Sequence, residues 1–149
     1  MSEGLQKSVT LRCDGACISN PSPMTGVGMA LYEGGDAVKM WGATPDAQTN
    51  NEAEYASVIN GLKVALEMGY AHITVLNDNQ MVVKQITVEW NTHSKTLKPF
   101  LNEATELLER FESWEIRWVP REKNEMVDAI AKEQVKIAQR QRTPWAGAI

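Results

Sequence analysis

Cysteine is scarce in this chain of 149 residues, where only Cys13 and Cys17 occur, close together and without a second pair downstream. This excludes a disulfide framework and offers no zinc-site spacing, so we expect buried or incidental thiols in a reducing cytosol. No run approaches the ~18 apolar residues of a membrane span. Met1–Gly4 has neither the basic start nor the apolar centre of a signal peptide. We therefore expect a cytoplasmic protein without a membrane partner.

Histidine and basic charge are scarce as well. His72 and His93 are the only histidines, and no convincing Ser–His or Cys–His arrangement suggests a side-chain nucleophile. The formal net charge is −4, which does not favour a nucleic-acid partner. Bound cations would neutralise acidic groups locally, however, so the composition does not exclude an anionic substrate. With 43% hydrophobic and 23% charged residues, the chain suits one domain of ordinary size.

Periodic segments follow one another between residues 8 and 139 without a long linker. Alternating polarity or a short apolar run between turn residues predicts a strand, and apolar residues recurring every three to four positions predict a helix. The expected strands are Ser8–Asp14, Gly26–Tyr32, Ala37–Ala43, Ile73–Leu76 and Trp114–Val119, and the expected helices are Thr49–Gly69, Met81–Ile86, Leu97–Phe111 and Asn124–Ala138.

Local signals support these limits. Gly34-Gly35 predicts a short hairpin turn, and Thr49 to Glu52 has the capping-box form that precedes a helix. A strand, a helix and another strand in succession favour parallel pairing with a right-handed crossover. The order predicts an α/β fold, a mixed five-stranded sheet with helices on its faces. We expect one domain over residues 1–138 and a short C-terminal tail over 139–149, which is a frayed end or, alternatively, a small nucleic-acid or partner contact.

Four carboxylates stand near the limits of the expected elements: Asp14, Glu54, Asp78 and Asp128. Two follow strands and two lie near helix starts, and ligands of open α/β sheets bind at the carboxyl ends of strands. Each acid alone has a plain explanation as a turn former or a partner of the helix dipole. Together they would repel one another unless cations lay between them. Their joint placement therefore indicates a magnesium site and cleavage of a phosphodiester.

Four motifs in a fixed order add to this interpretation. They are Asp14-Gly15-Ala16-Cys17 with Asn20-Pro21-Ser22-Pro23 and Gly26-Val27-Gly28; Thr49-Asn50-Asn51-Glu52-Ala53-Glu54; Asn77-Asp78-Asn79-Gln80; and Val119-Pro120-Arg121-Glu122-Lys123-Asn124 leading to Asp128-Ala129-Ile130-Ala131. On these motifs the chain resembles type 1 ribonuclease H, which cuts RNA in RNA–DNA hybrids, over about residues 8–137.

The resemblance implies a ribonuclease H-like fold with strand order 3-2-1-4-5, the second strand antiparallel and helices on both faces. It also implies that Asp14, Glu54, Asp78 and Asp128 are catalytic and bind two Mg²⁺ ions, with Mn²⁺ as an alternative. The chain would then be an endonuclease that hydrolyses the RNA strand and leaves 5′-phosphate and 3′-hydroxyl ends. We expect a monomer without an obligatory protein partner.

The resemblance assigns substrate contacts as well. Asn20, Asn50, Asn51 and Gln80 match family positions that contact the hybrid in its minor groove, where amides can recognise a 2′-hydroxyl. Thr49 matches a contact to a phosphate of the DNA strand. The alternative is that these residues serve only as helix caps and turn formers.

The sequence departs from the family pattern in two places. The loop Pro120–Asn124 has no histidine, and Arg121 is a candidate auxiliary residue that could stabilise phosphate charge but would be a poor base. Alternatively, Arg121 pairs with Glu122 or Glu125 on the surface. Only Glu89–Thr96 stands where some members insert a basic protrusion, and Trp90, His93 or Lys95 could contact the DNA strand instead. We expect weaker and salt-sensitive hybrid binding.

Three other functions are compatible with parts of the sequence. One is a catalytically weak or inactive hybrid-binding module, which would have no use for a repulsive acid cluster. Another is a nuclease of the same fold that acts on double-stranded RNA. The third is a phosphoacceptor domain built around Asp78, which leaves the antiparallel opening of the sheet unexplained.

Overall fold

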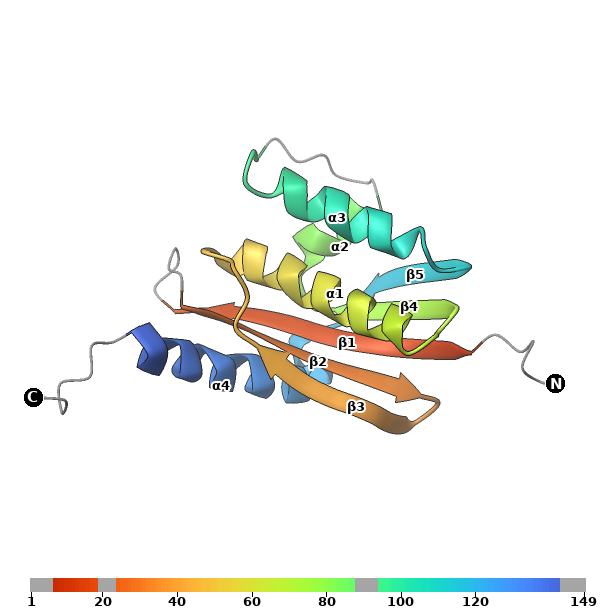
Figure 1. Cartoon of the computed structure of the whole chain (residues 1–149), viewed down its shortest axis with the longest axis horizontal. Helices are drawn as coiled ribbons and strands as arrows, with labels where there is room; N and C mark the ends of the chain where they lie inside the picture. The colour runs from red at the N-terminus through yellow and green to blue at the C-terminus, as the bar shows by residue number, and fades with distance from the viewer. Residues whose placement is uncertain (1–6, 19–23, 88–93, 143–149) are drawn as a thin grey trace, which may run out of the picture.

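The computed structural model describes residues 7–18, 24–87 and 94–142 as one layered α/β structure (Figure 1). The strands are β1 (Ser8–Cys17), β2 (Thr25–Glu33), β3 (Asp36–Ala43), β4 (His72–Asn77) and β5 (Ser113–Trp118). The helices are α1 (Asn50–Glu67), α2 (Gln80–Ile86), α3 (Lys98–Leu108) and α4 (Glu125–Arg142), with a short 3₁₀ helix at Arg121–Lys123. All nine predicted strands and helices are confirmed, with shifts of a few residues at their ends.

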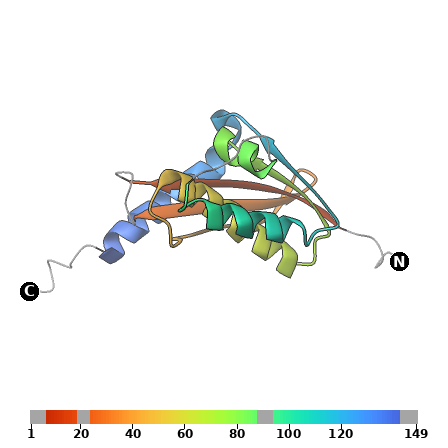
Figure 2. The same ribbon diagram turned by 90° about the horizontal axis from the view of Figure 1, so that it is seen from above.

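The sheet has the order β3-β2-β1-β4-β5, as the resemblance implied. β2 pairs antiparallel with both β1 and β3, whereas β1 with β4 and β4 with β5 are parallel. α1, α2 and α3 cover one face of the sheet and α4 lies on the other (Figures 1 and 2). The parallel half therefore directs the ends of β1 and β4 to the same edge.

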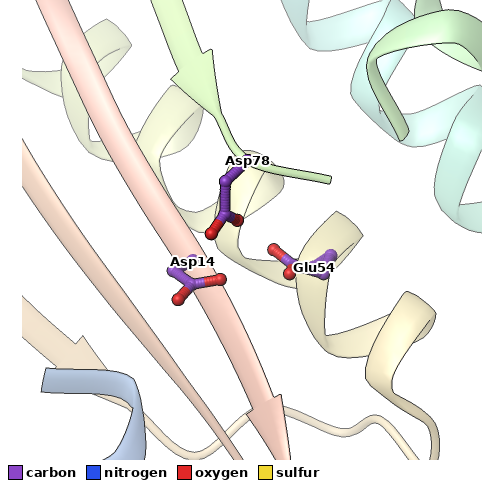
Figure 3. Close-up of side chains that lie close together, drawn as sticks. All are labelled: Asp14, Glu54 and Asp78. Atoms are coloured by element: carbon purple, nitrogen blue, oxygen red, sulfur yellow. The ribbon is translucent and has the colours of Figure 1, made fainter. Parts of the chain in front are cut away.

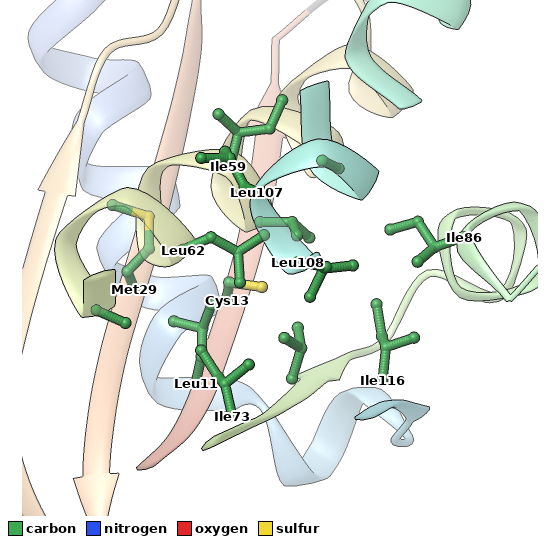
Figure 4. Packing of buried hydrophobic residues seen from close by; sticks show 14 of the residues in the cluster. Leu11, Cys13, Met29, Ile59, Leu62, Ile73, Ile86, Leu107, Leu108 and Ile116 are labelled. Carbon is green, nitrogen blue, oxygen red and sulfur yellow. The ribbon is translucent and has the colours of Figure 1, made fainter. Parts of the chain in front are cut away.

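The main hydrophobic cluster lies between the sheet and the helices α1 and α3 (Figure 4). The alternation predicted for the first strand is confirmed, because Val9, Leu11 and Cys13 are all buried. Leu62 of α1 and Leu108 of α3 are fully buried against them. This apolar layer fixes the height of α1 above β1, and with it the height of any side chain that α1 directs toward the edge of the sheet.

α1 begins and ends at the predicted signals. Thr49 Oγ1 accepts a hydrogen bond from the main-chain N–H of Glu52 at 3.0 Å. Glu52 Oε1 accepts from Gln48 N at 2.9 Å, one residue before the cap that a standard capping box would use. Gly69, with φ of 88°, follows the helix in the left-handed region that glycine tolerates.

The first strand is longer than predicted. It was expected to end at Asp14, but β1 continues to Cys17, because residues 15–17 pair with residues 25–27 of β2. The parallel pairing of β1 with β4 stops earlier, at Arg12 with Leu76. Asp14 is therefore held in the sheet by β2 on one side, while β4 has no paired residue beside it on the other.

α4 packs closely on β2. A Cβ added to Gly28 would lie 2.2 Å from the main-chain oxygen of Val127, so only glycine allows this approach. The close packing places the first turn of α4 next to the middle of β1. The helix continues to Arg142, so the segment expected as a tail from Gln139 begins inside the helix. No helix within the described ranges is both long and apolar enough to cross a bilayer.

Candidate active site

Three of the four predicted acids meet at one point. Asp14 comes from β1, Glu54 from α1 and Asp78 from the turn after β4, and a carboxylate oxygen from each lies within 4.8 Å of the others. Figure 3 shows the three side chains pointing toward one another. The predicted convergence is confirmed for these three residues.

Gly15 makes the approach of Glu54 to Asp14 sterically feasible. A Cβ at this position would lie 2.3 Å from the main-chain carbon of Ala53, in the first turn of α1. The N–H of Gly15 also lies 2.9 Å from Asp14 Oδ1 and 3.1 Å from Glu54 Oε1, as a donor to both. Sequence reasoning gave Gly15 no role of its own, although a glycine directly after an acidic residue was a usable signal.

Asn77 is a second residue whose role was missed. Its side chain is fully buried at the end of β4, and Nδ2 donates to Glu54 Oε1 at 3.3 Å. Trp118 supports the same turn, because its indole N–H donates to the main-chain oxygen of Asp78 at 3.2 Å. An amide ending an otherwise apolar strand was the available signal for Asn77. No local pattern pointed to Trp118.

Asp128 lies beside the cluster rather than within the group of three. It is in the first turn of α4, and its Oδ2 is 3.0 Å from Lys132 Nζ. Burial raises the pKa of Asp128, but the hydrogen bond with Asp14 and the ammonium group of Lys132 outweigh it, so the net shift is downward. Asp128 is therefore the acid of this site that ionises most readily.

The other three acids resist ionisation. Burial raises the pKa of Asp14 far above the ordinary carboxyl range, and the charges of Glu54 and Asp78 raise it further. Burial likewise raises the pKa of Glu54. It also raises that of Asp78, against the opposing charge of Arg121. Like charges in a desolvated cluster cannot all ionise without a counter-charge, so the site favours a bound cation.

The chemistry of the donors fits a hard divalent cation, because carboxylate oxygens are the protein ligands that Mg²⁺ prefers. A cationic side chain that contacts Asp78 is that of Arg121, whose Nε is 3.7 Å from Oδ2 and whose side chain is 83% exposed. An exposed, single-point contact of this kind neutralises a buried cluster only weakly. Arg121 nevertheless lies beside the site, and its auxiliary role stays a prediction.

The predicted substrate residues lie at the starts of α1 and α2. Asn51 Oδ1 accepts from Asn79 Nδ2 at 3.3 Å, which brings the two helix starts together. Asn50 and Gln80 are exposed there, and Thr49 caps α1. Nothing in these contacts tests nucleic-acid binding, which stays a prediction. Asn20, Trp90 and His93 lie outside the described residues.

Comparisons with known proteins identify relatives of this chain. The family model described as "Reverse transcriptase-like" matches residues 12–134. Ribonuclease HI of Halobacterium salinarum is 41% identical over 126 residues, covering 84% of this chain and 63% of that protein. Ribonuclease H of Syntrophus aciditrophicus is 32% identical over 145 residues, covering 86% of this chain and 80% of that protein. The bifunctional protein Rv2228c of Mycobacterium tuberculosis is 30% identical, and the chain spans only 36% of its length.

Solved structures agree with the fold. The N-terminal ribonuclease H domain of Rv2228c matches with a TM-score of 0.86 and 27% identity, over 93% of this chain and 100% of that one. Ribonuclease H1 of Halobacterium salinarum matches with a TM-score of 0.83 and 38% identity, over 87% and 98%. LC11-RNase H1 in complex with an RNA/DNA hybrid has a TM-score of 0.81 over 87% and 98%, and its 24% identity supports likeness of fold alone.

Proposed function

The chain belongs to the reverse transcriptase-like family, with ribonucleases H among its relatives, and from this premise we propose that it hydrolyses the RNA strand of RNA–DNA hybrids. The observation that carries the proposal is the meeting of Asp14, Glu54 and Asp78 from three separate elements. A module that only binds nucleic acid would gain nothing from mutually repulsive carboxylates.

We assign Asp14, Glu54, Asp78 and Asp128 as the residues that hold two divalent cations, magnesium by preference and manganese as an alternative. When bound, such ions supply the activation of the attacking water and the stabilisation of the departing 3′ oxygen. The expected products carry 5′-phosphate and 3′-hydroxyl ends. This reaction needs no side-chain nucleophile, which agrees with the absence of a Ser–His or Cys–His pattern in the sequence.

The protein groups around the acids have distinct roles in this proposal. Gly15 N–H and Asn77 Nδ2 hold Glu54 by hydrogen bonds, so that its carboxylate faces Asp14. Arg121 extends from the 3₁₀ helix toward Asp78, where its exposed guanidinium can pair with a phosphate. We assign its guanidinium to electrostatic stabilisation rather than proton transfer.

Substrate choice is assigned to the joined starts of α1 and α2. Asn50, Asn51 and Gln80 carry amides that both donate and accept hydrogen bonds, which suits the 2′-hydroxyls and base edges of a minor groove. Asn20 is assigned to the same contact from the sequence. Thr49 is assigned to a DNA-strand phosphate, in addition to capping α1. LC11-RNase H1, a protein of this fold, has been solved in complex with an RNA/DNA hybrid.

The test is a cleavage assay with three labelled duplexes: an RNA–DNA hybrid, duplex RNA and duplex DNA. We expect wild type to cut only the RNA of the hybrid, and only with magnesium rather than a chelator. Asp14→Asn should lower the rate by more than about 100-fold, because ligand-set changes cost at least as much as changes in the groups that orient ligands. Asp36→Asn, at the start of β3, is the matched control and should cut like wild type.

Two results would contradict the proposal: full activity of Asp14→Asn, or cleavage that continues in the chelator. Comparable cutting of duplex RNA would favour the alternative nuclease of this fold. The expected cytoplasmic location and monomeric state are likewise proposals. Cell fractionation and light scattering of the purified chain would test them.

A further inference from the structure

The main-chain oxygen of Cys13, the residue before Asp14, accepts hydrogen bonds from two side chains that are distant in sequence. Asn77 Nδ2 donates to it at 3.1 Å and Asn124 Nδ2 at 2.9 Å. The two asparagines are buried, with exposures of 0% and 1%. A carbonyl oxygen has two lone pairs, so these amides saturate it. β1 is thus tied to β4 and to the start of α4 immediately before the first acid.

These two hydrogen bonds lie just beyond the point where β1 and β4 stop pairing. The parallel ladder between β1 and β4 ends at Arg12 with Leu76, so Cys13 is the first residue of β1 beyond it. A buried carbonyl without a partner would be costly, and β4 has no paired residue beside Cys13. The two side-chain amides bond to β1 just beyond the last β1–β4 pair, where the two strands must stay together to keep Asp14 near Asp78.

Asn77 joins three of the acid-bearing segments by itself. Besides Cys13 O on β1, its Nδ2 donates to Glu54 Oε1 on α1 at 3.3 Å. Its Oδ1 accepts from Asn79 N at 2.8 Å, across the turn that carries Asp78. One neutral side chain thereby contacts Glu54 directly. It also contacts the residue before Asp14 and the residue after Asp78.

Asn124 connects the fourth segment. It precedes α4, and its main-chain oxygen accepts from Asp128 N at 3.1 Å, so the residue that contacts Cys13 also begins the turn that carries Asp128. Its Oδ1 is buried without a hydrogen-bond partner in the part of the chain that the structure describes. The amide is thus oriented by the bond that Nδ2 makes to Cys13, at the cost of leaving its own oxygen unpaired.

We infer that Asn77 and Asn124 are positioning residues that hold the four acid-bearing segments together through the Cys13 carbonyl and so set the affinity for divalent cations. The physical reason is repulsion: four carboxylates separate unless the surrounding structure holds them before the cation arrives. Groups that orient metal ligands typically change metal affinity by about 10–100-fold when they are removed. This inference rests on the proposed function in that it takes these acids as the metal ligands.

The direct test is magnesium binding to the full chain without nucleic acid, measured by titration calorimetry. Asn77→Leu keeps a similar volume and removes every hydrogen bond of the Asn77 amide, so we expect its magnesium affinity to fall by about 10-fold or more. The magnesium concentration that gives half-maximal cleavage should rise by the same factor. The KM for the hybrid at saturating magnesium should stay unchanged, because neither asparagine is placed at the substrate.

Val75→Ala is the matched control. Val75 lies on the same strand as Asn77 and is equally buried, but its side chain is apolar and contacts no carboxylate by hydrogen bonding. It should lower the melting temperature and leave magnesium affinity as in wild type. Asn124→Ser covers the case in which Asn77→Leu does not fold, because serine is well tolerated directly before a helix and lacks the amide donor to Cys13 O. Its magnesium affinity should fall too.

The outcomes separate this inference from the proposed function. Unchanged magnesium affinity in folded Asn77→Leu, or in Asn124→Ser if the former does not fold, overturns the positioning role even if wild type cleaves hybrids. Weakened magnesium binding in the variants supports the role even if wild type cleaves no nucleic acid, a result that would refute the proposed function alone. A wild type that binds no magnesium overturns the inference.

Discussion

At the scale of single residues, the site depends on neutral neighbours as much as on its acids. Burial raises the pKa of Asp14, Glu54 and Asp78, and the charge of a neighbouring carboxylate raises each of them further. The N–H of Gly15 and the amide of Asn77 stabilise Glu54 without adding charge. They lower its pKa only in part, so the remaining repulsion is left for a cation to relieve.

Gly15 gives a sharp test of the distance between β1 and α1. In Gly15→Ala the new Cβ would lie 2.3 Å from the main-chain carbon of Ala53, so the helix must move away. We expect a loss of about 1–3 kcal/mol in the free energy of unfolding, measured by urea denaturation, because overpacked sites cost this much. Cleavage should fall as well, since Glu54 moves with the helix.

The control for this substitution is Gly35→Ala in the hairpin between β2 and β3. A Cβ at Gly35 meets nothing within 4 Å, so stability and cleavage should both stay close to wild type. A Gly15→Ala protein as stable as wild type would show that α1 and β1 can separate without cost. The steric account of the site would then be wrong.

At the scale of elements, the start of α1 combines a structural and a proposed functional task. Thr49 caps the helix through Oγ1, while Glu52 bonds back to Gln48. The cap fixes the first turns, from which Glu54 reaches the acids. Loss of the cap should therefore affect both the helix and the site.

Thr49→Ala should lower the free energy of unfolding by about 0.5–2 kcal/mol, the usual cost of removing a threonine cap. Thr49→Ser keeps the capping oxygen and should recover most of that stability, as measured by urea denaturation. If Thr49 also contacts a DNA phosphate, the alanine variant should show a higher KM for the hybrid and the serine variant should not. Equal stability of all three proteins would contradict the capping role.

At the scale of the whole molecule, the acids whose pKa is raised make stability depend on pH and on bound metal. A carboxyl whose pKa is higher in the folded than in the unfolded state contributes stability below its unfolded value, about 4, and loses it as pH rises toward the folded value. Asp14, Glu54 and Asp78 all act in this direction, and Asp128, with its lowered pKa, acts in the opposite one. Through the three acids with raised pKa, the free energy of unfolding of the metal-free chain should therefore fall as pH rises.

We expect magnesium to raise the melting temperature more at pH 8 than at pH 5, because bound cations favour the ionised acids. At a concentration of 100 times the dissociation constant, binding stabilises the folded state by about 2.7 kcal/mol. Thermal melts in chelator and in magnesium at both pH values measure this, with Asp14→Asn as the variant that should lose most of the shift. Equal shifts at pH 5 and pH 8 would speak against the carboxylate cluster as the metal site.

Charge across the whole surface also predicts how a hybrid binds. The net charge is −4, and Lys95 is the described basic residue of the segment that replaces the protrusion of other members. With few phosphate contacts available, we expect weak hybrid binding that weakens further with salt. The dissociation constant of the inactive Asp14→Asn protein, measured over a series of salt concentrations, tests this. A value that hardly changes with ionic strength would count against phosphate pairing.

The sequence by itself determined the features that local chemistry encodes. Alternation along Val9, Leu11 and Cys13 predicted which face of β1 is buried, and the Thr49 cap predicted where α1 starts, because each depends on neighbours within a few positions. The order of strands and helices predicted a mixed five-stranded sheet, and the resemblance to ribonuclease H implied the strand order in which Asp14 and Asp78 can meet. For those reasons the three central acids were predictable.

Only the tertiary structure decided how these acids are held. The extension of β1 to Cys17 depends on pairing with β2, and the approach of Gly15 to Ala53 depends on the packing of α1. The bonds from Asn77 and Asn124 to the Cys13 oxygen join residues from three distant parts of the chain, and Asp128 lies beside the cluster because α4 packs on β2. Contacts between distant segments leave no periodic trace in a single sequence, since each partner satisfies its own local pattern whether or not the other is there.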